Sequence, residues 1–77
     1  MKAKKLRALL RKQLGYYKKP GSKGNGSHQR LVSDLGHSPI TFAFHDTATV
    51  SPRTVRAILV EQVGLTLEEA MEVVDNA

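Results

Sequence analysis

Residues 28–45 have the sequence HQRLVSDLGHSPITFAFH, and this stretch decides the fold class because it predicts a β-hairpin. Its second half alternates apolar side chains with smaller or polar ones, which is the period of a half-buried strand. The apolar positions of this alternation are Ile40, Phe42 and Phe44. We therefore expect strands at 28–34 and 39–45, with a turn over 35–38 between them.

A helix and another strand are predicted before the hairpin. Residues 3–14 carry leucines at helical spacing, which predicts an amphipathic helix, and Gly15 follows in the position of a left-handed C-cap. Residues 16–19, YYKK, then predict a short strand that Pro20 ends. The segment 20–27, PGSKGNGS, has the composition of a loop.

Two more helices are predicted after the hairpin, beyond a connection over residues 46–50. Ser51 and Pro52 form a typical helix start, and Gly64 ends that helix. Thr66 with Glu69 matches a capping box, so a short acidic helix is expected over 67–74. The element order α-β-β-β-α-α predicts an α+β fold, a small three-stranded antiparallel sheet with helices packed on one face.

Length and composition narrow the function classes. A chain of 77 residues is expected to form one domain with one modest core, which argues against a deep, enclosed cofactor site. The absence of cysteine excludes disulfides, thiolate metal sites and cysteine nucleophiles, and it fits a cytoplasmic protein. No apolar run approaches the roughly 18 residues of a membrane span, so no membrane association is expected.

Charge is distributed unevenly along the chain. Residues 1–30 hold ten lysines and arginines and no acid, whereas residues 31–77 hold two arginines against seven acids, so the halves carry +10 and −5. Such asymmetry indicates a surface that binds a polyanion. It is also compatible with a solvated charge run that only keeps the protein soluble, and the charge pattern leaves both interpretations open.

Several kinds of catalytic site find no support in the sequence. The glycine-rich loop lacks the ending of a phosphate-binding P-loop, the acids are scattered, and the three histidines are not spaced like zinc ligands. Ser27 and His28 are neighbours whose side chains would point to opposite faces of a strand, which argues against a serine nucleophile with this histidine as its base. What remains is Gly26-Ser27-His28, where the loop enters a strand among cations.

Several short motifs, in this order along the chain, make the sequence resemble the HicA family, which consists of small RNA-cleaving toxins from bacterial toxin–antitoxin pairs. The resemblance covers roughly residues 6–70. Its motifs are Leu14-Gly15-Tyr16, Gly26-Ser27-His28, Ile40-Thr41-Phe42 with His45, Thr54-Val55-Arg56-Ala57-Ile58-Leu59 and Gly64-Leu65-Thr66. Three features depart from the family pattern: a longer loop before His28, Gln29 where a second histidine is common, and Ala43 where proline is usual.

The resemblance implies a fold similar to double-stranded-RNA-binding domains and a cytoplasmic toxin that cleaves messenger RNA. It implies His28 as the single catalytic residue, no metal or other cofactor, and a HicB-type antitoxin as the protein partner. Histidine suits this role because its unperturbed pKa lies near neutrality. The residues predicted to contact RNA are Lys12, Lys18, Lys19, Lys23, Gly26, Ser27 and Arg30.

Other functions stay open at this point. The same basic fold could bind RNA without cleaving it, or bind DNA, although neither main helix shows a base-reading pattern. The acidic last helix could instead bind a basic protein partner. Tyr16 and Tyr17 could stack on bases, but they alternate in a strand, so one of them is expected in the core.

Overall fold

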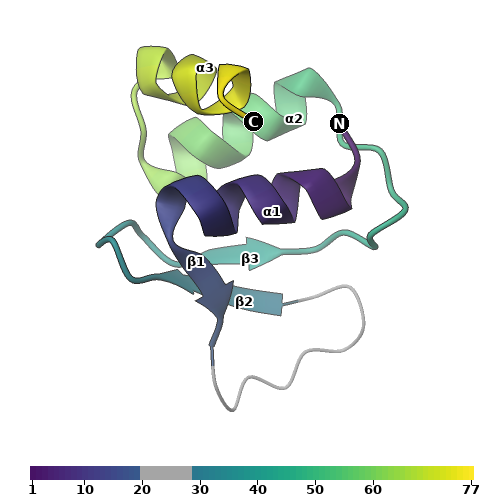
Figure 1. Cartoon of the computed structure of the whole chain (residues 1–77), viewed down its shortest axis with the longest axis horizontal. Helices are drawn as coiled ribbons and strands as arrows, with labels where there is room; N and C mark the ends of the chain where they lie inside the picture. Colours follow the sequence, from purple (N-terminus) through teal and green to yellow (C-terminus); the bar gives the residue numbers. More distant parts are fainter. Residues whose placement is uncertain (20–28) are drawn as a thin grey trace.

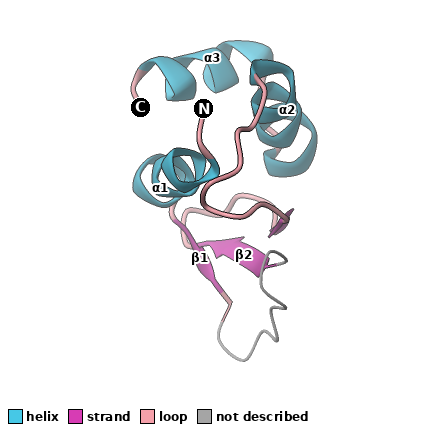
Figure 2. Cartoon of the chain, turned by 90° about the vertical axis from the view of Figure 1, so that its right-hand side faces the viewer, coloured by secondary structure: helices cyan, strands magenta, loops and turns pink. Residues whose placement is uncertain are grey.

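The computed structural model of the chain describes residues 1–19 and 29–77. In chain order the elements are α1 (Ala3–Leu14), β1 (Tyr16–Lys18), β2 (Gln29–Ser33), β3 (Ile40–Phe42), α2 (Pro52–Ala57), η1 (Ile58–Val63) and α3 (Leu67–Asp75). The helices lie together on one side of the strands, with α1 next to the sheet and α2 and α3 beyond it (Figure 1). A view from the side shows the same layers (Figure 2). The predicted α+β fold, similar to double-stranded-RNA-binding domains, is therefore confirmed.

The three strands form an antiparallel sheet in the order β1-β2-β3. The paired residues include Tyr17 with Val32, Leu31 with Ile40, and Gln29 with Phe42. The predicted hairpin is present, but β3 is shorter than the predicted strand 39–45. The chain leaves the sheet after Phe42 and turns at His45, whose carbonyl accepts a hydrogen bond from the Ala48 N–H at 2.9 Å.

The turn from α1 into β1 is held by hydrogen bonds from the end of β2. Gly15 has a φ of 71°, and its N–H donates to the Leu10 carbonyl, which confirms the predicted left-handed C-cap. The Gly15 carbonyl in turn accepts the Asp34 N–H at 3.0 Å. The Ser33 hydroxyl donates to the Leu14 carbonyl at 2.6 Å. These bonds fix the direction in which β1 leaves the helix.

We expect Gly15→Ala to destabilise the protein more than Gly64→Ala. Both glycines are left-handed helix caps, so alanine costs about 1–2 kcal/mol of backbone strain at either position. A Cβ at Gly15 would also lie 2.8 Å from Cγ of Leu35 and collide with the Asp34 carboxylate, whereas at Gly64 no described heavy atom lies within 4 Å. Urea denaturation followed by circular dichroism measures the difference. Equal losses in the two variants would mean that Asp34 and Leu35 rotate away without cost.

The helix starts after the hairpin are formed as the sequence predicts. The Ser51 hydroxyl accepts the Thr54 N–H at 3.2 Å, ahead of Pro52. Thr66 and Glu69 form both bonds of a capping box, at 2.9 and 3.1 Å. Between these caps the helix widens to π-type hydrogen bonding over η1, a change that the leucine and valine spacing does not indicate.

The connection over residues 46–50 pairs with the N-terminus. The Met1 amino group donates to the Val50 carbonyl at 2.8 Å, and the Val50 N–H donates back to the Met1 carbonyl at 2.7 Å. Lys2 and Thr49 form an isolated antiparallel bridge. This segment therefore ties the start of α1 to the start of α2, in addition to linking β3 to α2.

Apolar side chains from both halves of the chain form one buried cluster between the sheet and the helices. Its largest fully buried members are Tyr16, Phe42, Leu6, Leu10, Ile40, Leu59 and Val50. Tyr16 is thus the core tyrosine of the pair, and its hydroxyl donates to the Ser38 carbonyl at 2.6 Å. Burial raises the pKa of the Tyr16 phenol, as expected for a group that must stay neutral in the core.

Candidate functional site

The predicted catalytic motif lies outside the part of the chain that the structure describes. Lys23, Gly26, Ser27 and His28 all belong to residues 20–28, so their roles stay predictions. Gln29, the next residue after His28, begins β2 and pairs with Phe42 of β3. The described neighbours in sequence are Lys18, which ends β1, Lys19 directly after it, and Arg30 on the paired strand β2.

The other two histidines have surroundings that suit structural roles. His37 is half-buried in the β2–β3 turn, and its ring is roughly parallel to that of Tyr16 with 6.4 Å between the centroids. His45 is exposed at the turn after β3, where its carbonyl accepts the bond from Ala48 described above. Both therefore serve as natural comparisons for His28.

Arg7 is engaged within the fold. Its guanidinium lies over the Phe42 ring at 5.1 Å, and its Nη2 atom is 3.2 Å from a carboxylate oxygen of Asp46. This is the one ion pair within residues 1–19 and 29–77. Lys2 is exposed, and its Nζ donates to the Thr47 carbonyl at 3.3 Å. The remaining described cations of the first thirty residues are exposed and lie on α1, on β1 or directly after it, and on β2.

The described residues among those predicted to contact RNA do not all lie on one surface. Lys12 lines a shallow hollow with Lys5 and Gln13 on the side of α1 that faces α3, where the Gln13 amide donates to the Val73 carbonyl at 2.9 Å. Lys19 and Arg30 instead lie on the sheet, where the Lys19 N–H donates to the Arg30 carbonyl at 3.0 Å. The fold thus brings Lys19 and Arg30 together and places Lys12 on a separate surface.

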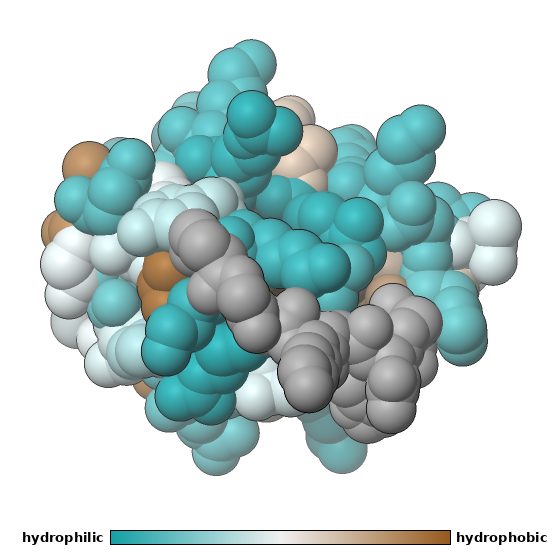
Figure 3. Space-filling model, turned by 90° about the horizontal axis from the view of Figure 1, so that it is seen from below, coloured by the Kyte–Doolittle hydropathy of each residue, from teal (hydrophilic) through white to brown (hydrophobic). Residues whose placement is uncertain are grey.

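The sheet has one face toward the helices and one open face, defined by Tyr17, Lys19, Arg30, Val32 and Thr41. Strand alternation and register place these residues together. Lys18 points the other way, because it pairs with the buried Leu31. Figure 3 views the molecule from the strand side, and the described surface there is largely hydrophilic.

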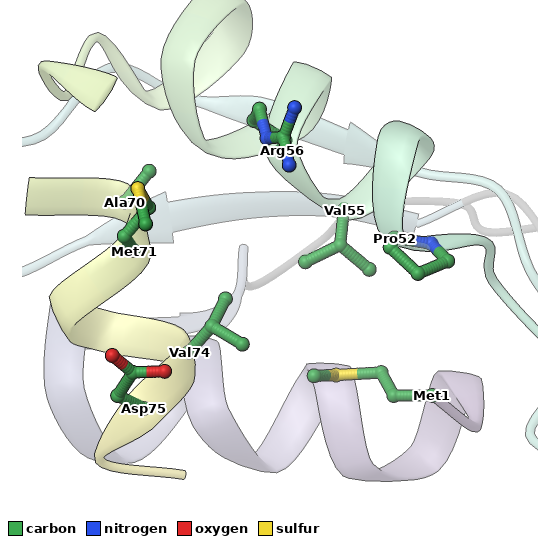
Figure 4. A pocket seen from close by; sticks show the side chains of 8 residues that line it. All are labelled: Met1, Pro52, Val55, Arg56, Ala70, Met71, Val74 and Asp75. Carbon is green, nitrogen blue, oxygen red and sulfur yellow. The ribbon is translucent and has the colours of Figure 1, made fainter. Parts of the chain in front are cut away.

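A larger hollow, of about 260 Å³, lies on the helix side of the molecule. It is lined by Met1, Pro52, Val55, Arg56, Ala70, Met71, Val74 and Asp75. Figure 4 shows that these residues come from the N-terminus, α2 and α3. Its walls are mainly apolar, and its two charged residues, Arg56 and Asp75, do not form an ion pair. The residues that line it include one carboxylate, Asp75, and no histidine, so the lining does not supply the pair of titratable groups that acid–base catalysis uses.

The described residues contain neither a cluster that could hold a metal ion nor a membrane-spanning helix. In residues 1–19 and 29–77, no three histidine or acidic side chains come close enough to hold a metal ion. None of the described helices has both the length and the apolar character that a bilayer crossing requires. The Glu69 carboxyl has a lowered pKa because it accepts the Thr66 backbone N–H in the capping box, which is a structural role.

Comparison with known proteins identifies the family. The model of a family described as the HicA toxin of bacterial toxin–antitoxin systems matches residues 3–65, from the start of α1 to the residue after Gly64. No curated protein matches the chain, and no solved structure matches it. The match covers most of the chain and includes both the basic first half and the Gly26-Ser27-His28 motif. The chain therefore belongs to the HicA family of toxins from bacterial toxin–antitoxin systems, and it pairs with an antitoxin.

Proposed function

We propose that this toxin is a cytoplasmic endoribonuclease that cleaves messenger RNA, with His28 as general base and without a metal ion. The observation that carries the proposal is the family match over residues 3–65, which spans a motif with histidine set among cations. The test is cleavage of RNA by the purified toxin, with His28→Ala as the deciding variant.

RNA supplies the nucleophile for this reaction. The proposed step forms a bond between the ribose 2′ oxygen and phosphorus and breaks the bond from phosphorus to the 5′ oxygen. His28 takes the proton from the 2′-OH, and the leaving 5′ oxygen takes a proton from a water molecule. One product ends in a 2′,3′-cyclic phosphate and the other begins with a 5′-hydroxyl. Histidine is suited to this step because its unperturbed pKa lets it act as a base near pH 7.

Cations close to this motif in sequence support the proposal. Lys18 and Lys19 precede the loop and Arg30 follows it, while Lys23 belongs to the loop itself. Their charges stabilise a transition state in which negative charge builds on the phosphate oxygens. The backbone N–H groups of Gly26 and Ser27 are further candidates for contacts to phosphate.

We propose a HicB-type protein as the antitoxin. It inhibits the toxin by covering His28 and the basic residues that bind RNA. Acidic groups on the antitoxin would complement the +10 charge of residues 1–30, which hastens association as well as blocking RNA.

The affinity of the toxin for RNA should fall steeply as salt is added. Lysines and arginines that neutralise phosphates release counterions, so four contacts on a single strand give a slope of about −3 for log affinity against log salt. The slope is measured by fluorescence anisotropy with a labelled, non-cleavable RNA. Lys19→Ala should make the slope shallower by about 0.7.

Arg53→Ala is the matched control for the salt experiment. Arg53 is an exposed cation on α2, in the half of the chain with net negative charge. Its removal should leave the slope unchanged. A flat salt response of the native toxin would contradict RNA binding by the basic first half.

A further inference from the structure

Tyr17 lies on the open face of the sheet, on the edge strand β1. Its side chain is 46% exposed, whereas the neighbouring Tyr16 is buried in the core at 2%. It pairs directly with the half-buried Val32, so an apolar side chain flanks its ring on β2. The ring therefore contacts the sheet on one side and presents its remaining surface to solvent.

Two cations lie beside Tyr17 on the same face. Lys19, the residue after β1, lies opposite Arg30 of β2, two residues along from the Tyr17–Val32 pair, a distance of about 7 Å along a strand. Arg30 is steadied by a neighbour, since its Nη1 atom is 3.4 Å from the Thr41 hydroxyl. The row formed by Lys19, Arg30 and Thr41 thus carries two positive charges.

The open face is polarised along the strands. The acid that alternation places on it, Asp34, lies at the far end from Lys19 and Arg30, where its carboxylate is next to Gly15. Tyr17 therefore separates a cationic end from an acidic end. A phosphodiester chain is attracted to the first and repelled from the second, which leaves a base free to reach the tyrosine between them.

We propose that Tyr17 is a stacking platform for an unpaired base of single-stranded RNA, whose adjacent phosphate binds Lys19 and Arg30. The inference rests on the proposed RNA function and deepens it by naming the substrate class. A base paired within a duplex does not expose its face to a side chain, so this contact selects single strands, loops or ends. Every base has a π-face, so Tyr17 contributes affinity with little sequence preference.

The choice of RNA over a protein partner follows from the composition of the face. A protein-docking surface has an apolar centre with charges at its rim, whereas Tyr17 here adjoins a single half-buried valine and a row of cations. Alternating aromatic and basic groups are instead the pattern with which proteins hold single-stranded nucleic acid.

The test uses the absence of tryptophan from the chain. Tyr17→Trp should keep its affinity for a single-stranded RNA of about eight nucleotides with methylated 2′ oxygens, which resists cleavage by the proposed route. Its indole fluorescence should be quenched as the RNA binds, because a base stacks on the ring. Tyr17→Ala should bind the same RNA about 10-fold more weakly. Tyr17→Leu, which keeps an apolar strand residue, should weaken binding comparably while preserving the circular dichroism spectrum.

Leu67→Trp is the matched control, because Leu67 is similarly exposed, at 51%, but lies on the acidic helix α3. Its fluorescence should not change with RNA. The proposal is overturned if Tyr17→Ala binds like the native protein, or if only the antitoxin, and not RNA, quenches Tyr17→Trp. Cleavage that survives in His28→Ala would refute the catalytic assignment alone, since the fluorescence of Tyr17→Trp reports on binding without cleavage.

Discussion

His28→Ala should lower the rate of RNA cleavage by about 10²- to 10⁴-fold, the usual contribution of a positioned acid–base group. Removing the imidazole takes away the proposed acceptor for the 2′-OH proton and leaves the lysines and arginines that bind the phosphates. The rate is measured under single-turnover conditions with labelled RNA, and RNA affinity by anisotropy. Affinity should change little, because a neutral histidine adds little to phosphate binding.

The same experiment distinguishes attack by the ribose oxygen from attack by water. An RNA with one 2′-deoxy residue just before the scissile phosphate should bind normally and resist cutting at that bond. EDTA should have no effect, and the products should carry a 2′,3′-cyclic phosphate. Cleavage at the deoxy position, or loss of activity in EDTA, would assign the attack to water and call for a different role for His28.

His37→Ala and His45→Ala are the matched controls, because the three histidines differ in their surroundings. His37 is half-buried beside Tyr16 and His45 is exposed at a turn. Each should keep cleavage within a few-fold of the native rate. If all three variants cleave RNA at the native rate while binding it equally well, the chain uses another catalytic group.

The parts of the fold that the sequence predicts correctly are those with local causes. The left-handed cap at Gly15, the Ser51 N-cap and the Thr66–Glu69 capping box each depend on a few adjacent residues, and all are present. The alternation in β3 likewise identifies Ile40 and Phe42 as buried. In each case residues that are adjacent in sequence determine the hydrogen bond or the burial pattern.

Features with non-local causes could not be predicted in this way. The pairing of Met1 with Val50 joins residues far apart in sequence, and no motif marks either partner. Lys12 lies beside the C-terminal residues and Lys19 lies beside Arg30, a difference that comes from packing and that the charge of the two lysines does not indicate. The alternation of Tyr16 and Tyr17 predicted that one is buried, but only packing decides which.

Phe42→Ala should destabilise the folded protein by about 3–5 kcal/mol, the usual cost of removing a buried phenylalanine. The side chain is 1% exposed, meets the Phe44 ring edge-to-face at a centroid distance of 5.5 Å, and has the Arg7 guanidinium over its own ring at 5.1 Å. A chain of this length has about 4–12 kcal/mol of total stability, so the variant should lose much or all of it. Urea denaturation followed by circular dichroism measures the loss.

This variant also bears on the function, because Phe42 pairs with Gln29, the residue that follows His28. Loss of the aromatic anchor frees the end of β3 and with it the first described residue of β2, so toxicity in cells should disappear. Phe42→Leu is the control, since leucine fills most of the space and should cost about 1–1.5 kcal/mol while keeping toxicity. If the free energy of unfolding of Phe42→Ala lies within about 1 kcal/mol of the native value, the ring does not anchor this end of the sheet. The Gln29–Phe42 pairing is then held by backbone bonds alone.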